Sequence, residues 1–90
     1  MLKTLQIEKI VKGFANHTRI EMLYLIKENP ELSLMDISKK LQINLKTASE
    51  HLRRMNVSGL IQKRNYGQSV LHKISPLGED ILEFIKKLQQ

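Results

Sequence analysis

The sequence contains no cysteine and no tryptophan, and it has only four glycines and two prolines. Without cysteine there is no disulfide framework and no thiolate for redox chemistry or metal binding. The longest uninterrupted apolar run, Met22 to Ile26, is far shorter than the ~20 residues needed to span a bilayer. These absences argue against a disulfide-stabilised secreted protein, a thiol enzyme and a membrane protein. They are compatible with the reducing cytoplasm, where we expect the chain to reside.

The residues that are present indicate one small basic domain spanning 1–90. Ninety residues leave no room for a second domain. Fifteen lysines and arginines outnumber nine acidic residues, which gives a formal net charge of +6 and a pI of about 9.8. Such a charge favours a polyanionic partner, either DNA, RNA or, less well supported, an anionic membrane. The N-terminus lacks the continuous apolar core of a signal peptide.

Helix signals divide the chain into five helices and a hairpin. Apolar spacing predicts terminal helices over 2–15 and 76–89, and Ser75 and Pro76 are suited to start the second of these. Asn16 is a suitable N-cap for another helix, which Pro30 ends. The two terminal helices carry these apolar residues: Leu2, Leu5, Ile10, Phe14, Ile81, Phe84, Ile85 and Leu88.

A helix-turn-helix is predicted over residues 33–58. Ser33 and Asp36 have the spacing of a capping box, and Gln42 to Asn44 form the turn. Gln42 stands where many such units have glycine, so it implies either a different turn or backbone strain of about 1 kcal/mol. The helix that follows buries Leu45, Ala48, Leu52 and Met55, and it ends at Gly59. Its opposite side presents Lys46, Thr47, Glu50 and Arg54, with Ser49, His51 and Arg53 on the flanks, and all of these except His51 are expected to contact DNA.

A basic hairpin follows over residues 60–75. Two strand-like runs, 60–64 and 69–74, are joined by the turn-forming segment Asn65 to Gln68. Between Lys46 and Lys73 there are six basic residues and one acid, Glu50. The order of helices and strands, α-α-α-α-β-β-α, is that of a mainly α winged helix-turn-helix, which places one helix in a DNA major groove. The hairpin residues expected to contact DNA are Lys63, Arg64, Tyr66 and Gln68.

Glu50 requires an explanation, because a carboxylate that faces DNA repels phosphate. It either accepts a hydrogen bond from a cytosine or orients Arg54 through an i,i+4 ion pair, and we favour the ion pair. Thr47 and Ser49 either contact DNA or are small polar residues at a helix contact. For the basic residues, the alternative to DNA contact is a solvated surface.

No catalytic or metal-binding arrangement is evident. His17, His51 and His72 lie in separate elements without the paired spacing of a metal site. No Ser/His/Asp set or phosphate-binding glycine loop is present. We therefore expect no enzyme activity, no cofactor and no metal.

Three segments resemble the ArsR-type winged-helix transcriptional regulators. FANHTRIEMLYLI, from Phe14 to Ile26, resembles that family's second-helix signature, with Thr18 and Arg19 at its Thr-Arg positions. LKTASEHLRRMNVSGLI is similar to its recognition helix, and KRNYGQSVLHKIS to its wing. The resemblance implies DNA binding by a homodimer that forms through the first and last helices. Metal-sensing members carry a Cys-x-Cys-type site on the third helix or an Asp/His set on the last helix, whereas LMDISKKL and LGEDILEFIKKL contain neither Cys nor His.

The sequence therefore predicts a homodimeric regulator that binds specific sites in double-stranded DNA. Two rival functions remain open at this stage. A winged helix can bind RNA or another protein, because the fold alone does not determine the ligand. A nonspecific architectural DNA-binding protein would show strong, salt-dependent affinity without sequence preference.

Overall fold

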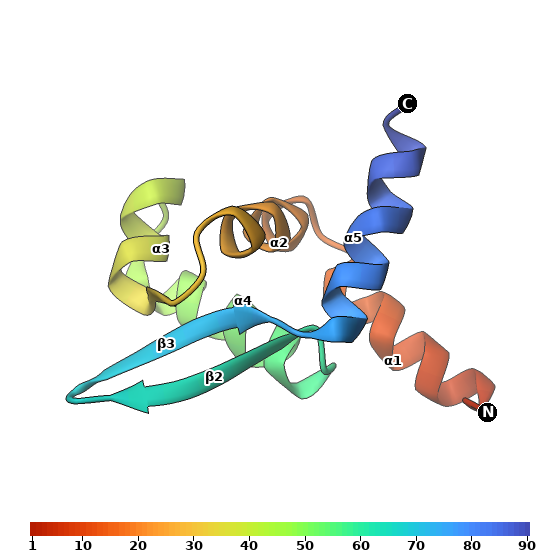
Figure 1. Ribbon diagram of the computed structural model, residues 1–90, viewed down its shortest axis with the longest axis horizontal. Helices are drawn as coiled ribbons and strands as arrows, with labels where there is room; N and C mark the ends of the chain where they lie inside the picture. The colour runs from red at the N-terminus through yellow and green to blue at the C-terminus, as the bar shows by residue number, and fades with distance from the viewer.

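A computed structural model describes residues 1–90 and contains five helices and a three-stranded sheet (Figure 1). It confirms the predicted winged helix-turn-helix and adds one short strand, β1. No helix has both the length and the apolar character needed to cross a membrane. The elements in chain order are α1 Thr4–Phe14, α2 His17–Glu28, β1 Leu32–Ser33, α3 Leu34–Leu41, α4 Leu45–Val57, β2 Ile61–Tyr66, β3 Ser69–Ile74 and α5 Pro76–Leu88.

The predicted helix starts are confirmed by their capping hydrogen bonds. Asn16 Oδ1 accepts from the backbone N–H of Thr18 at 2.9 Å. Ser33 Oγ accepts from the Asp36 N–H at 3.1 Å, and the Asp36 carboxylate accepts in return from the Ser33 N–H at 3.5 Å. These bonds satisfy donors that the first turn of a helix leaves without partners. Residues local to each helix thereby determine where α2 and α3 begin.

The turn of the helix-turn-helix adopts the strained alternative. Gln42 has a left-handed backbone with φ of +56°, a conformation that costs a side-chain-bearing residue about 1 kcal/mol. The buried Ser38 hydroxyl donates to the Ile43 carbonyl at 2.6 Å, and the Ile43 N–H donates to the Ser38 carbonyl at 3.1 Å. Asn44 Oδ1 then accepts from the Thr47 N–H at 2.7 Å and caps α4. These bonds hold the angle between α3 and α4.

The first strand of the wing extends further than predicted. β3 is the central strand, antiparallel to both β1 and β2, and pairing extends from Ile61–Ile74 to Tyr66–Ser69. The turn consists only of Gly67 and Gln68, so the prediction that Asn65 and Tyr66 belong to the turn was wrong. Gly67 has φ of +61°, which allows a tight two-residue turn. Strand pairing therefore continues up to the residues that flank the turn. Figure 1 shows the hairpin projecting from the helices.

The core lies among α2, α3, α4, the base of the hairpin and α5. Two residues differ from their predicted places. Leu45 was expected in the buried stripe of α4, but its position at the start of the helix leaves it 45% exposed. Leu82 on α5 was not predicted to be apolar core, yet it is buried. The fully buried large side chains are Met22, Leu23, Ile26, Ile37, Met55, Leu60, Ile61 and Leu82.

Candidate nucleic-acid interface

Helix α4 presents its predicted polar face to solvent. Ala48, Leu52 and Met55 hold the opposite side of the helix in the core. All six side chains predicted to contact DNA are exposed along this one helix: Lys46, Thr47, Ser49, Glu50, Arg53 and Arg54. The geometry therefore leaves this face free for a partner.

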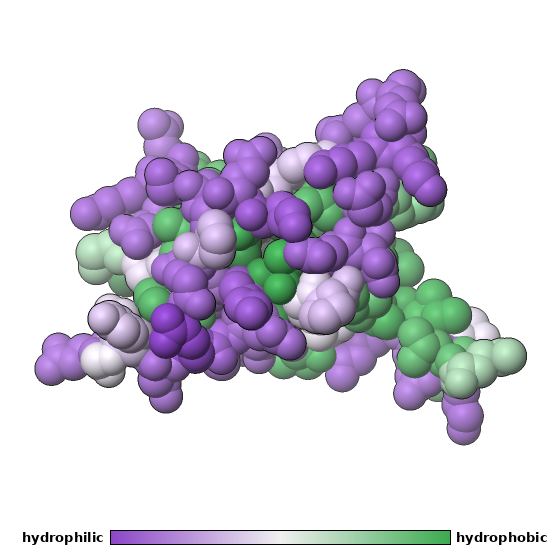
Figure 2. Space-filling view, in the orientation of Figure 1, coloured by the Kyte–Doolittle hydropathy of each residue, from purple (hydrophilic) through white to green (hydrophobic).

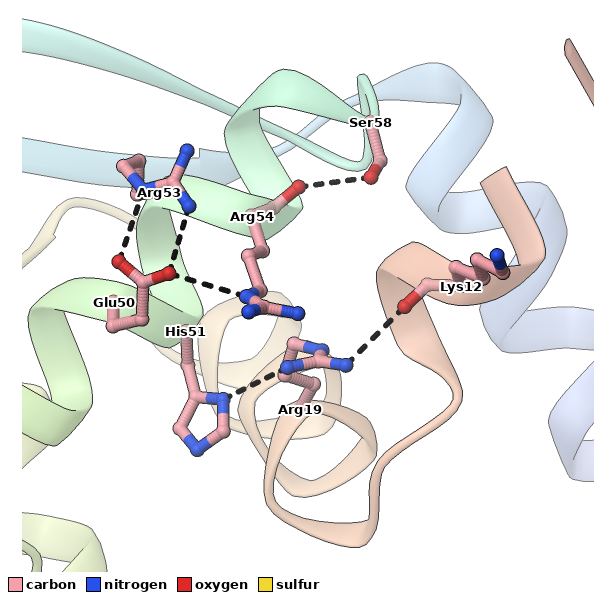
Figure 3. Close-up of polar contacts among 7 residues, drawn as sticks. All are labelled: Lys12, Arg19, Glu50, His51, Arg53, Arg54 and Ser58. Atoms are coloured by element: carbon pink, nitrogen blue, oxygen red, sulfur yellow. Dashed lines mark hydrogen bonds and ion pairs between the residues drawn. The ribbon is translucent and has the colours of Figure 1, made fainter. Parts of the chain in front are cut away.

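Glu50 is the centre of an ion-pair network on that face (Figure 3). Its carboxylate accepts from Arg53 at 2.9 and 2.7 Å and from Arg54 Nε at 3.2 Å. The hydrogen bonds from Arg53 and then Arg54 lower the pKa of Glu50 to about 2, so the carboxylate is ionised. The favoured i,i+4 pair is present, and Arg53 adds a two-point contact that sequence reasoning missed. Neither terminal nitrogen of Arg54 bonds to another protein group.

A buried arginine connects α4 to α1 and α2. Arg19 on α2 is only 7% exposed. One terminal nitrogen donates to His51 Nδ1 at 3.0 Å, and the other donates to the Lys12 carbonyl at 3.2 Å (Figure 3). Because Arg19 must donate, His51 accepts through an unprotonated Nδ1. Arg19 thus positions α4 against the end of α1. The sequence identified Arg19 only as part of the second-helix signature and did not predict this role.

Two histidines with lowered pKa values are expected to make stability depend on pH. Burial, followed by the charge of Arg19, lowers the pKa of His51, and burial lowers the pKa of the 5% exposed His72. The unfolded chain therefore binds protons first as pH falls below about 6.5, so the free energy of unfolding should decrease between about pH 6.5 and 5. Urea unfolding at several pH values measures this. His72→Gln should flatten the curve, and an unchanged midpoint from about pH 7.5 to 5 would contradict the prediction.

The wing residues divide between the two faces of the hairpin. Lys63 makes no ion pair and lines a groove of about 260 Å³ together with Ser49 and Arg53 of α4. Arg64 lies on the other face, where Nε donates to Glu31 Oε2 at 2.8 Å and the guanidinium lies 5.4 Å from the centre of the Tyr66 ring. Lys63 is therefore oriented toward α4, whereas Arg64 is held by neighbours in the same chain. Tyr66 and Gln68 are exposed near the hairpin end.

The terminal helices expose only part of the apolar set predicted for dimerisation. Leu2, Leu5, Phe84 and Leu88 are 52–77% exposed. Ile85 is 5% exposed, so its assignment to an interface was wrong: it belongs to the core of the monomer. Figure 2 shows apolar surface gathered over α1. Three predicted residues are half-buried against the core, namely Ile10, Phe14 and Ile81, and three exposed residues were missed, namely Met1, Ile7 and Val11.

The structure contains no group of three His, Cys, Asp or Glu side chains arranged to hold a metal ion.

The fold of the chain defines the class to which the protein belongs, a winged helix-turn-helix. The sequence pattern of bacterial regulatory proteins of the arsR family matches residues 16–63. The chain therefore belongs to the arsR family, whose members are regulators and not enzymes, as predicted.

Individual proteins similar to this chain include a transcriptional activator and a domain of the same fold. The transcriptional activator HlyU of Vibrio cholerae is 30% identical over 66 residues, which span 73% of this chain and 60% of that protein. A solved structure of HlyU from Vibrio cholerae superposes with a TM-score of 0.84 at 27% identity, covering 98% of this chain and 97% of the other. The winged helix-turn-helix domain of Mb0332 from Mycobacterium bovis, described as homodimeric and DNA-binding, has a TM-score of 0.84 at 24% identity, with 93% and 78% covered.

Proposed function

We propose that this chain is a homodimeric transcriptional regulator that binds specific sites in double-stranded DNA. The observation that carries the proposal is the polar face of α4, which presents Lys46 and Arg54 opposite the core-facing stripe. An α-helix with these side chains fits a major groove, where arginine and lysine donate to phosphates and to guanine edges. Membership of a family of regulatory proteins supports the same proposal.

Dimerisation would proceed through α1 and α5. Figure 1 shows both helices at the end of the molecule opposite the tip of the wing. Leu5 and Leu88, at 77% and 68% exposed, are large apolar side chains that water surrounds in the monomer. A two-fold partner would cover them and would set two α4 helices about one DNA turn apart, ~34 Å. The homodimeric state of the Mb0332 domain supports dimerisation of this chain.

The wing would contribute to affinity through Lys63 more than through Arg64. The slope of log K against log salt is negative, and Lys63→Ala should reduce its magnitude by about 0.9, the value for a single phosphate contact. Arg64→Ala should have a smaller effect, because Glu31 already pairs with Arg64. DNA binding measured between about 50 and 300 mM chloride tests this prediction. Equal slopes for wild type and Lys63→Ala would show that the wing points away from DNA.

Competition experiments separate this proposal from its rivals. A labelled duplex bound by the protein should be displaced by unlabelled duplex DNA of the same sequence and much less by RNA duplexes or single strands. Displacement by RNA at equal concentration would favour an RNA-binding module. Equal displacement by every DNA sequence, with strong salt dependence, would favour a nonspecific architectural protein.

A further inference from the structure

A second basic groove lies between α1 and the C-terminal half of α4. It has a volume of about 360 Å³. Lys9 and Lys12 line it from α1, Arg53 and Arg54 line it from α4, and Glu8 is the single acid in its wall. No sequence pattern pointed to this groove, because its two walls are far apart along the chain.

The α1 wall of the groove packs tightly against the end of α4. A Cβ atom on Gly13 would lie only 2.3 Å from Ser58 Oγ, so glycine alone permits this approach. Ser58 Oγ also donates to the Arg54 carbonyl at 2.8 Å and lies 3.5 Å from the Lys9 carbonyl (Figure 3 shows the first of these). The part of α1 that carries the lysines therefore packs directly against the end of α4 that carries the arginines.

Positive charge in and below this groove is incompletely neutralised. Lys9 has no carboxylate partner, and Lys12 lies 3.8 Å from Glu8 in an exposed pair that contributes little. Arg54 donates to Glu50 through Nε alone, which leaves the two terminal nitrogens of Arg54 free. The buried Arg19 lies close by, and its Nε has no hydrogen-bond partner. Burial and then the charge of Arg54 lower the pKa of Arg19, as expected of crowded like charges.

We infer that this groove binds a phosphate of the DNA backbone and extends the DNA interface from α4 onto α1. Arg53 lines both this groove and the one beside Lys63, so a continuous basic surface runs from the wing across α4 to α1. A phosphodiester there would accept from Arg54 and from the ammonium groups of Lys9 and Lys12. The inference rests on the proposed function, since it assumes that α4 faces DNA.

The test is the K9Q/K12Q variant, with K27Q/K87Q as a control that removes two lysines elsewhere. Glutamine retains the helix and the Lys12 backbone carbonyl that Arg19 uses. For a chosen duplex, K9Q/K12Q should reduce the magnitude of the slope of log K against log salt by about 1 to 2, since each phosphate contact accounts for about 0.9. Sequence preference should not change, because phosphate contacts carry no direct sequence information. The control should keep the slope of the wild type within about 0.3.

A duplex carrying single methylphosphonates locates the phosphate that the groove binds. At that phosphate, neutralisation should weaken wild-type binding about 3- to 10-fold and leave K9Q/K12Q unaffected. This result would still identify the phosphate if the variant had lost overall affinity. Equal salt slopes for wild type and K9Q/K12Q, together with identical methylphosphonate profiles, would overturn the inference while leaving DNA binding intact. Failure of the wild type to bind any duplex would instead overturn the proposed function.

Discussion

Replacing Leu5 and Phe84 with glutamate is expected to give a folded monomer with about 100-fold or more lower affinity for a two-fold symmetric DNA site. Both side chains are large and at least half exposed, so the charged replacements remain in water within the monomer. In a dimer they would be buried without partners, which is strongly unfavourable. A monomer also loses the effective-concentration advantage of two linked DNA-binding helices, typically a factor of about 10² to 10⁴. Sedimentation equilibrium and titration with a symmetric duplex measure both effects.

A matched control separates dimer loss from simple charge repulsion. Gln6→Glu with Gln90→Glu adds the same two negative charges near the chain ends without touching an exposed apolar side chain. This control should remain dimeric and lose affinity only modestly. Ile85→Glu should behave differently from both, because it places a charge in the monomer core and should lower the unfolding midpoint. A stable dimer for the Leu5 and Phe84 variant would contradict the assembly proposal.

Arg54→Ala and Lys46→Ala are expected to weaken binding to a preferred site by about 1–3 kcal/mol each where the side chain bonds to a base. Both side chains are exposed on α4, so their removal should leave the fold intact. Removal of a base contact should relax preference at one position of the site. Removal of a phosphate contact should weaken all sequences alike and lower the salt slope by about 0.9.

The K27Q substitution on α2 provides the comparison, since Lys27 pairs with Glu79 away from α4. It should leave affinity nearly unchanged, because exposed ion pairs contribute little. Fluorescence anisotropy with the preferred duplex and single-base variants measures the effects. If neither Arg54→Ala nor Lys46→Ala alters binding, another surface of the protein contacts DNA.

Local signals explain why most of the fold was predictable. Asn16, Ser33 and Ser75 each cap a helix through a side-chain oxygen, and Gly59 has the positive φ of a helix terminator. Strand β1 escaped prediction because two residues have no periodicity. It exists only through pairing with Leu71 and His72, which are distant along the chain.

The candidate site was predictable where it depended on helical spacing. The Glu50–Arg54 pair follows from i,i+4 geometry, whereas the Arg19–His51 bond joins residues 32 positions apart and leaves no local pattern. The buried face of α5 could not be chosen from the sequence, because Ile85 belongs to two overlapping apolar stripes. Only tertiary packing shows that it lies inside with Leu82, leaving Phe84 outside.

Selection of binding sites from a random duplex library tests the central proposal most directly. The wild-type protein should enrich a two-fold symmetric motif whose half-sites lie about one helical turn, ~10 base pairs, apart, as two α4 helices in successive major grooves require. Enrichment of that motif would establish sequence-specific binding by a dimer. A selection that yields no motif, or a protein that prefers RNA of the same length, would contradict it.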